Sequence, residues 1–470
     1  MKKSSAKGKM KRAFSVAFAA LIAACGFSFA ACAEEESARV EAIARGDEAA
    51  LLTAAELDLE NTVFDDFSQG VDSSRWYIAN QSWGAYSNGG VVPENVGYTD
   101  DGVLVFTANG SHYKKGEVAG VGNVRDGSLT GGALISKFLA GPGRYQVRMK
   151  VLPRIGACTA MWVYAYQQTE SGALNHEIDI ELPGGNRSGT IGFDSVLNTN
   201  YITEEYNISE DVRVGDVLGG DVYLNDGQWH TFGFDWYTDP AMIVYSVDGV
   251  VTAVTTSFVP TLLTRLWLGV WIPNNAGFVG SPNFETDYMQ VDWFRYTPFT
   301  GQPYEEYEPN VGSVAAEAEY PSAPTEYASA DKISNGTFEY VTAQDPGGWV
   351  LANDCAFTAD GGADSSAGVH LTGNGILRQD VDAVYGGFRY TLGLMAKTKG
   401  TVCADIFWQT DISTVKTETI ELSAADWTSF TRELTAPAGC TRLRIEFYTE
   451  DGESVLWLDN VSLRFDGTEG

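Results

Sequence analysis

Acidic and apolar side chains alternate strictly from Glu177 to Leu182, within the run His176–Gly184. Glu177, Asp179 and Glu181 are separated by isoleucines, and a period of two residues is typical of a β-strand with one face in a core. The other face would carry three carboxylates in a row, which repel one another. Two such carboxylates can cleave a glycosidic bond, as nucleophile and acid/base, when they lie roughly 5–5.5 Å apart.

A solvent-facing acidic strand is the alternative interpretation, because the whole chain is acidic, with a formal net charge of −31. Three acids in strict alternation, with no Lys or Arg on the same face, are less ordinary, but from the spacing alone a catalytic and a structural cluster remain equally open. On an ideal strand the Cα atoms of Glu177 and Glu181 would be about 13 Å apart. Their side chains must therefore lean inward over the shorter Asp179 on a curved sheet.

The elements around this run are short. Residues 62–299 show brief alternating runs separated by Gly, Asn and Asp, without long helical periodicity, which favours a β-sandwich of jelly-roll type. Residues 300–330 are a linker by composition, and residues 331–467 begin again as strands. At 470 residues, the chain is expected to be all-β, with a second, smaller β-sandwich jelly roll.

The acidic run resembles the Glu-x-Asp-x-Glu signature of glycoside hydrolase family 16. The resemblance continues in family order from about Phe64 to Phe299, half of the chain. Its further blocks are Gly141–Lys150, Gly156–Trp162, Gln228–Phe232, Phe234–Trp236, Tyr245–Gly249 and Val291–Tyr296. This resemblance implies that Glu177 is the nucleophile, Glu181 the general acid/base, and Asp179 the residue that tunes the pair.

The signature has no extra residue before its second glutamate, so it is similar to the unbulged branch of the family, which includes lichenase-like members. This implies a retaining endo-β-glycanase acting on a β-1,3 or mixed β-1,3/1,4-glucan. However, Val91–Val96 lacks the Trp-Arg pair of lichenases, and Trp83 or Tyr86 would have to replace that platform. A galactan- or xyloglucan-active enzyme, a transglycosylase and a non-catalytic glycan-binding protein remain alternatives.

Further site residues follow from the same resemblance. Trp162 and Trp271 lie where the family presents aromatic platforms, with a core position as the alternative for each, and Asn198 is a candidate polar contact. The chemistry requires no cofactor. The family often holds a structural Ca²⁺, for which Asp292 would supply a carboxylate, and Asp66 and Gly102 would supply backbone oxygens.

The last segment resembles carbohydrate-binding modules of the family 4 and 9 type. The motifs that carry the resemblance are Asn335–Glu339, Gly348-Trp349 and Leu458–Leu463. Trp408 is a candidate lining of a sugar groove, and a core aromatic is the alternative. The further candidates are Tyr385, Phe388 and Tyr390.

The N-terminus combines a basic region with an apolar run, as in a secretory signal over residues 1–33. Two endings fit: a lipobox with lipidated Cys32, which we favour, or a signal-peptidase site at Ala31-Cys32-Ala33. A second lipobox-like run ends at Cys25. Residues 34–61 read as an acidic tether. We therefore expect a bacterial extracellular protein or cell-surface lipoprotein that meets the membrane only through this anchor.

The net charge and the spacing of His and Cys limit the kinds of molecule that this protein is expected to bind. The acidic charge disfavours nucleic acid and suits a neutral polysaccharide substrate. The four His are dispersed without zinc spacing, and no disulfide can be predicted from the four Cys that follow the signal. We expect a monomer.

Overall fold

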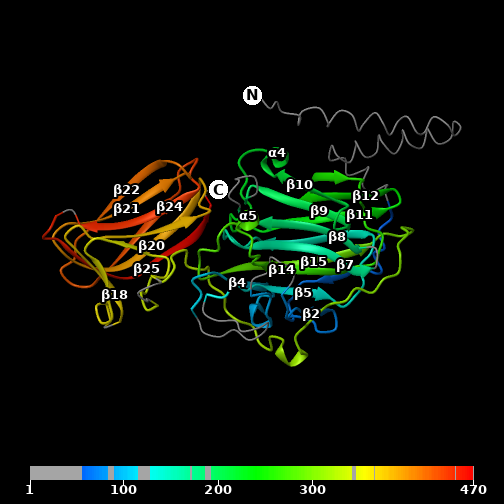
Figure 1. The fold of residues 1–470 in the computed structure, drawn as a ribbon, viewed down its shortest axis with the longest axis horizontal. Helices are drawn as coiled ribbons and strands as arrows, with labels where there is room; N and C mark the ends of the chain where they lie inside the picture. The colour runs from blue at the N-terminus through cyan, green and yellow to red at the C-terminus, as the bar shows by residue number, and fades with distance from the viewer. Residues whose placement is uncertain are drawn as a thin grey trace.

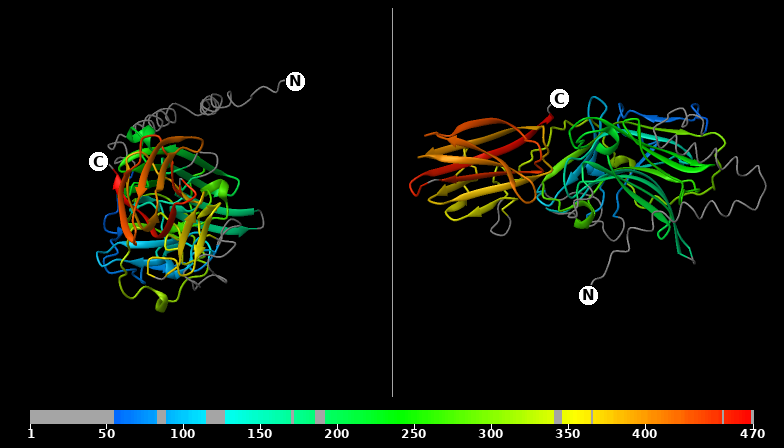
Figure 2. Two further views of the ribbon diagram at one scale, coloured as in Figure 1. Left: turned by 90° about the vertical axis from the view of Figure 1, so that its left-hand side faces the viewer. Right: turned by 90° about the horizontal axis from the view of Figure 1, so that it is seen from above.

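The structure, a computed structural model, describes residues 55–82, 89–114, 127–169, 172–185, 192–340, 346–364, 366–449 and 451–468. Within these residues the chain forms two β domains that lie end to end (Figure 1, Figure 2). Strands β1 to β15 form the first domain and strands β16 to β25 the second. The prediction of an all-β chain with two β-sandwiches is confirmed.

The first domain pairs two antiparallel sheets. In spatial order the eight-stranded sheet contains β13 (Val250–Thr255), β12 (Ala241–Val247), β11 (His230–Thr238), β6 (Gly143–Lys150), β15 (Thr286–Pro298), β4 (Leu104–Asn109) and β3 (Val96–Tyr98), with β1 (Val63–Asp65) also paired to β15. The seven-stranded sheet contains β10 (Asn207–Arg213), β9 (Ser195–Thr203), β8 (Gly172–Pro183), β7 (Cys158–Thr169), β14 (Arg265–Trp271), β5 (Gly132–Ser136) and β2 (Trp76–Ile78).

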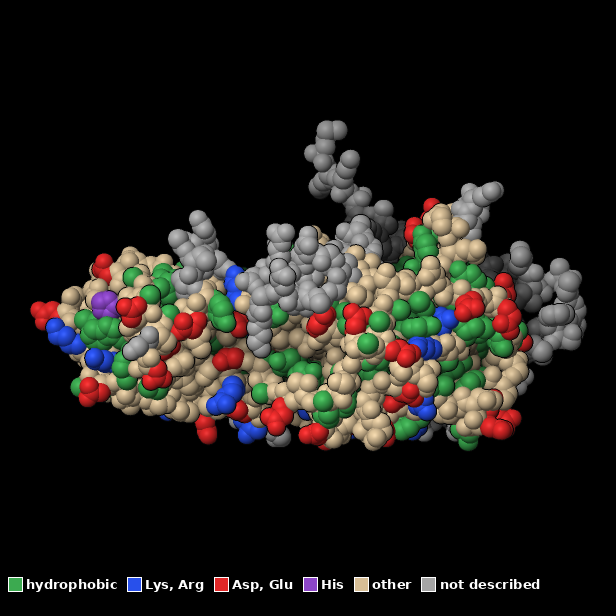
Figure 3. Space-filling view, turned by 90° about the horizontal axis from the view of Figure 1, so that it is seen from below, with side chains coloured by type: hydrophobic (Ala, Val, Ile, Leu, Met, Phe, Trp, Pro, Cys, Tyr) green, Lys and Arg blue, Asp and Glu red, His purple; other side chains and the backbone are tan. Residues whose placement is uncertain are grey.

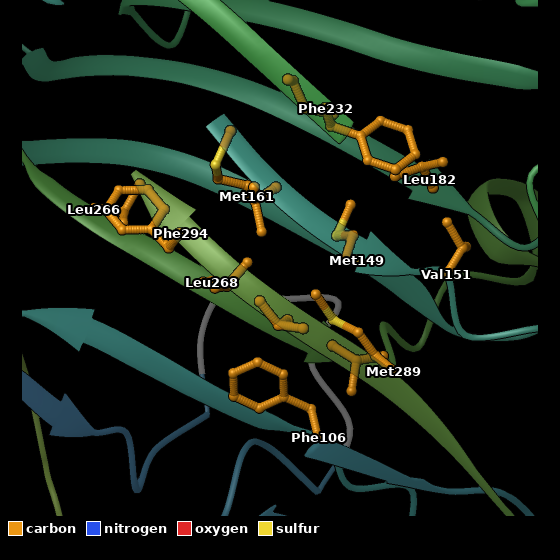
Figure 4. Packing of buried hydrophobic residues seen from close by; sticks show 14 of the residues in the cluster. Phe106, Met149, Val151, Met161, Leu182, Phe232, Leu266, Leu268, Met289 and Phe294 are labelled. Atoms are coloured by element: carbon orange, nitrogen blue, oxygen red, sulfur yellow. The ribbon is translucent and has the colours of Figure 1, made fainter. Parts of the chain in front are cut away.

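The core of this domain lies between the two sheets. In β6 every second side chain is buried, as the period of two requires. Figure 4 shows Met149 and Phe294 from the eight-stranded sheet packed near Met161 and Leu266 from the seven-stranded one. The outer face of the seven-stranded sheet is thereby left for other contacts.

The second domain has the same construction on a smaller scale. One sheet contains β16 (Val350–Ala352), β19 (Ile376–Asp382), β24 (Arg442–Thr449), β21 (Val402–Gln409) and β22 (Thr414–Leu422). The other contains β17 (Cys355–Thr358), β18 (Gly368–Thr372), β25 (Val455–Thr468), β20 (Phe388–Lys399) and β23 (Thr428–Thr435).

Helical segments are short throughout the described part of the chain. They are η2 (Pro93–Asn95), α4 (Gly215–Leu218), α5 (Ala276–Val279) and η3 (Glu317–Glu319). None of the helices in the described ranges has the length and apolar character needed to cross a membrane. The predicted signal, the lipidation site Cys32 and most of the acidic tether lie outside the described residues.

The linker prediction needs a correction. Residues 300–330, here called the strap, connect the two domains but are packed along the first one, and Figure 1 shows their yellow-green trace passing beneath it. Val314 forms a bridge to Ala79, and the Tyr320 hydroxyl donates to the Trp76 carbonyl oxygen at 2.9 Å. Composition identified a connection between domains, but it did not reveal these contacts.

A buried ionic cluster joins the two domains. Asp287, at the start of β15, accepts hydrogen bonds from Arg154 Nε and from Lys332 Nζ, each at 2.7 Å. All three side chains are less than 10% exposed. Tyr223 of the first domain stacks on Tyr385 of the second, with ring centroids 3.9 Å apart. The second domain is therefore docked on the first.

Candidate active site

Strand β8 presents the three acidic side chains on one face. It pairs with β7 without interruption from Cys158, opposite Pro183, to Thr169, opposite Gly172. Its apolar residues Ile178, Ile180 and Leu182 are at most 1% exposed and belong to the core between the sheets. If the pairing of β8 shifted by one residue, the carboxylates would point into this apolar core. The burial of the apolar side chains therefore fixes the register of β8. Both ladders of β8 are also regular across the signature, as its spacing predicts.

The neighbouring strands determine what each acid faces. Asp179 lies opposite Trp162 of β7 and Thr199 of β9. The corresponding neighbours are Tyr164 and Tyr201 for Glu177, and Ala160 and Leu197 for Glu181. Aromatic rings therefore flank one end of the acidic row.

A cavity of about 510 Å³ lies over the three acids. Its lining combines aromatic rings with polar groups, as expected for a site that binds sugar rings. The other lining residues are Gln81, Ala160, Trp162, Tyr164, Tyr166, Asn175, Tyr201, Glu204, Trp267, Trp271, Asn310, Val311 and Gly312.

Each glutamate has a separate hydrogen-bond donor. Asn175 Nδ2 donates to Glu177 Oε2 at 2.8 Å. The buried Cys158 thiol donates to Glu181 Oε1, with sulfur and oxygen 3.9 Å apart. Asp179 shares a hydrogen bond with Glu177. These contacts distinguish the two glutamates chemically although they lie on the same strand.

Burial raises the proton affinity of all three acids. It raises the pKa of Glu177 to about 7, although the hydrogen bonds from Asn175 and Asp179 act in the opposite direction. Burial and the charge of Glu177 raise the pKa of Glu181 to about 8. Burial and both glutamates raise the pKa of Asp179 well above its usual range. The hydrogen bonds from Asn175 and Asp179 thus favour the ionised form of Glu177, whereas the charge of Glu177 favours the protonated form of Glu181.

Two of the predicted platforms lie in this cleft. Trp162 and Trp271 both line the cavity and are partly exposed. Trp162 also stacks on Trp267, with ring centroids 5.4 Å apart. The sequence analysis did not select Trp267, although it lies four residues before Trp271 on β14, and the period of two places both on one face.

Asn198 does not face the cleft. It lies opposite Ile180, which belongs to the core face of β8, and it is only 2% exposed. Neither polar atom of its side chain has a hydrogen-bond partner among the described residues. Tyr201 of the same strand lines the cavity instead, and burial together with the three acids raises the pKa of its hydroxyl.

The candidate groove of the second domain is wrong at Trp408. This ring is completely buried, and its Nε1 donates to Glu418 Oε1 at 2.8 Å, so no sugar can stack on it. Phe388 and Tyr390 are buried in the same core. Tyr385 is partly exposed but stacks on Tyr223, beside a cavity between the domains. The alternation of these strands could not show which face was covered.

The side chains of two predicted calcium ligands already have protein partners. The Asp292 carboxylate is paired with the Arg148 guanidinium, and the Asp66 carboxylate accepts hydrogen bonds from Ser68. In the described ranges, no group of three or more His, Cys, Asp or Glu side chains is arranged to hold a metal ion. These contacts do not test the backbone oxygens of Asp66 and Gly102, so the calcium site stays a prediction. Trp83 lies outside the described residues.

Comparison with known proteins identifies the first domain. Residues 93–295 match the model for Glycosyl hydrolases family 16. A beta-glucanase of Paenibacillus macerans is 28% identical over 233 residues, which are 47% of this chain and 85% of that protein. A beta-glucanase of Paenibacillus polymyxa is 27% identical over 238 residues, 48% of this chain and 84% of that protein. The solved Bacillus licheniformis beta-glucanase covers 50% of this chain and 97% of its own, at 22% identity and a TM-score of 0.40. The first domain, which contains residues 93–295, is therefore the part of this chain that matches glycoside hydrolase family 16.

Proposed function

We propose that this protein is a retaining endo-β-glycanase that hydrolyses a neutral β-1,3 or mixed β-1,3/1,4-glucan. The observation that carries the proposal is the row of three carboxylates in an aromatic-lined cleft, where hydrogen bonds from Asn175 and Asp179 favour the ionised form of Glu177. Retaining glycosidases need an ionised nucleophile beside a protonated acid. The similarity to two proteins named beta-glucanase favours a glucan as the polymer.

Each acid has a separate role in the proposed mechanism. A carboxylate oxygen of Glu177 bonds to the anomeric carbon, while the glycosidic bond breaks and its oxygen takes the proton of Glu181. Water then gives a proton to Glu181, its oxygen bonds to the anomeric carbon, and the ester bond to Glu177 breaks. Asp179, whose pKa burial and the two glutamates raise well above its usual range, donates a hydrogen bond to Glu177 and holds it in position.

The test of these roles is chemical rescue. Glu177→Ala is expected to abolish turnover, and added azide to restore it with inverted anomeric configuration, because the small anion attacks from the vacated side. Glu181→Ala is expected to be rescued with retention, mainly on substrates with good leaving groups. Rescue with the two configurations exchanged would reverse the assignment.

Substrate and reaction type need a panel of polymers. We expect oligosaccharides from lichenan, laminarin or curdlan, with several intermediate lengths appearing early, as endo cleavage requires. Products from agarose, carrageenan or xyloglucan alone would move the enzyme to another substrate class. Products longer than the starting oligosaccharide would indicate a transglycosylase. The absence of any product, with binding retained, would indicate a glycan-binding protein.

The proposal includes two properties that rest on sequence alone. Export to the cell surface, with a lipid on Cys32, would bring the enzyme to a polymer too large to enter a cell. The second domain would bind polysaccharide as an accessory module, through residues other than the buried Trp408. Mass spectrometry of the mature N-terminus and retention on insoluble glucan would test them separately.

A further inference from the structure

The strap between the domains also forms part of the cleft. Asn310, Val311 and Gly312 line the same cavity as Glu177 and Trp162. They lie beyond residue 295, where the match to the family model ends. A segment that reads as linker in the sequence therefore meets whatever occupies the cleft.

Residues 307–309 attach the strap to the first domain before it reaches the cavity. The Tyr307 hydroxyl donates to the Tyr166 carbonyl oxygen at 2.9 Å. Arg265, only 7% exposed, pairs with Glu308 at 3.1 Å and donates to the Pro309 carbonyl oxygen at 3.4 Å. The strap is thus attached to strands β7 and β14, which carry the aromatic floor of the cleft.

Residues 311–315 attach the strap again after it has passed the cavity. Gln81 Nε2 donates to the Val311 carbonyl oxygen at 2.8 Å, and the Asn80 amide donates to the Ser313 carbonyl oxygen at 3.0 Å. The Ala315 amide donates to the Ile78 carbonyl oxygen at 2.9 Å. The strap therefore runs beside the end of β2, at the edge of the seven-stranded sheet, where Val314 forms a bridge to Ala79.

The turn between these anchors has a defined shape. Gly312 has a φ of +70°, a backbone conformation that favours glycine, and a Cβ there would lie 2.1 Å from Gln81 Oε1. Asn310 Oδ1 accepts a hydrogen bond from the Gly312 amide at 2.8 Å. This bond uses the acceptor of the Asn310 amide group. Its Nδ2 group has no hydrogen-bond partner among the described residues, and Asn310 lines the cavity.

Val311 adds an apolar side chain to the aromatic lining of the cleft. Its side chain is partly buried and packs on the cluster that contains Trp267, together with Trp162 and Tyr164. A flat apolar surface with one adjacent amide donor suits a pyranose ring, whose faces are apolar and whose edge carries hydroxyl groups. Glu204 also lines the cavity, and its charge disfavours sulfated or uronic sugars.

We propose that the strap supplies a sugar subsite of the cleft, in which Asn310 Nδ2 donates to a hydroxyl of one neutral hexopyranose unit and Val311 contacts its face. This rests on the proposed function, because it assumes that a glycan chain occupies the cleft. None of the strap contacts described above involves the three acids, so we expect this subsite to bind a different sugar unit from the one that reacts. Only substrates long enough to extend to the strap therefore use it.

The test compares variants on oligosaccharides of increasing length. Asn310→Asp keeps the acceptor that caps the turn but removes the donor, so it separates binding from structure. On long β-gluco-oligosaccharides we expect kcat/KM of Asn310→Asp, Asn310→Ala and Val311→Ala to fall about 3- to 10-fold, mainly through KM, as loss of one contact predicts. On short aryl glycosides all three are expected to stay within about twofold of wild type.

Ser313→Ala is the matched control, because this neighbouring side chain does not line the cavity, and it is expected to match wild type at every length. Asn310→Asp equal to wild type on long substrates, or losses equal at all lengths, would overturn the subsite. A wild-type enzyme inactive on every β-glucan would instead overturn the proposed function, and the subsite with it.

Discussion

Local environment separates the two glutamates that share strand β8. Glu177 receives a hydrogen bond from Asn175, whereas Glu181 receives a weaker one from a buried thiol and faces the charge of Glu177. The pKa of Glu177 is about 7 and that of Glu181 about 8. Between these values, the first glutamate can be ionised while the second still carries its proton.

The pH dependence of kcat/KM follows from this order. Activity is expected to rise with pH as Glu177 loses its proton near 7, and to fall as Glu181 loses its proton near 8. A bell-shaped profile with its maximum between these values is the expected outcome on a soluble glucan. A plateau that extends far into the acidic range would contradict the raised pKa of Glu177.

Asp179 is expected to act as a neutral hydrogen-bond donor. Asp179→Ala removes the bond that favours ionised Glu177 and is expected to lower kcat by ~10²–10⁴, the range for a positioned acid–base partner. Asp179→Asn keeps an N–H donor and is expected to lose clearly less. Equal losses in steady-state assays of the two variants would show that the carboxyl proton itself is needed.

Cys158 is a positioning residue for Glu181 rather than a reactant, because burial and the adjacent acid raise the pKa of its thiol well above the usual range. Cys158→Ala removes a donor that favours ionised Glu181, so the alkaline limb of the pH profile is expected to move to higher pH. Cys440→Ala, buried in the second domain, is the control. An unmoved limb would leave Cys158 with a packing role only.

At the scale of elements, β8 supplies the acids while β7 and β14 supply the aromatic floor. Trp271→Ala is expected to lower kcat/KM on soluble glucan about 5- to 150-fold, equivalent to about 1–3 kcal/mol by analogy with ring stacking on other flat ligands. Trp293→Ala is a control of the same size, because Trp293 on β15 contacts Phe64 and Arg295 instead of the cleft. Similar losses in both variants would indicate general destabilisation.

At the scale of the whole molecule, the ionic cluster makes the two domains interdependent. Asp287→Ala would leave Arg154 and Lys332 buried without their shared partner, and breaking such a cluster costs about 3–5 kcal/mol. Asp221→Ala, which removes an exposed partner of Arg213, is expected to cost about 0–1 kcal/mol. Denaturant unfolding of the full chain measures both, and equal midpoints would show that the domains do not depend on this contact.

The net charge is a second property that belongs to the molecule as a whole. Acidic side chains are scattered over both domains on the face shown in Figure 3, as the net charge of −31 leads one to expect. Such a surface repels anionic polymers and suits a neutral glucan. It adds to the same preference inside the cleft, where Glu204 lies beside the three acids.

The sequence by itself determined the two sandwiches and the face of β8 that carries the acids. Alternation is local, so the period of Glu177, Asp179 and Glu181 shows without any partner strand that they share a face. The aromatic residues Trp162 and Trp271 were also found, because their strands resemble a known family.

Tertiary structure alone decided which surfaces are covered. Asn198 faces the core because of its register with β8, and Trp408 is buried by a sheet whose position its own strand cannot specify. The strap reaches the cleft because Val311 meets Gln81, 230 residues earlier in the chain. Periodicity reports which residues lie on one face of a strand, whereas burial depends on what packs against that face, and distant segments decide this.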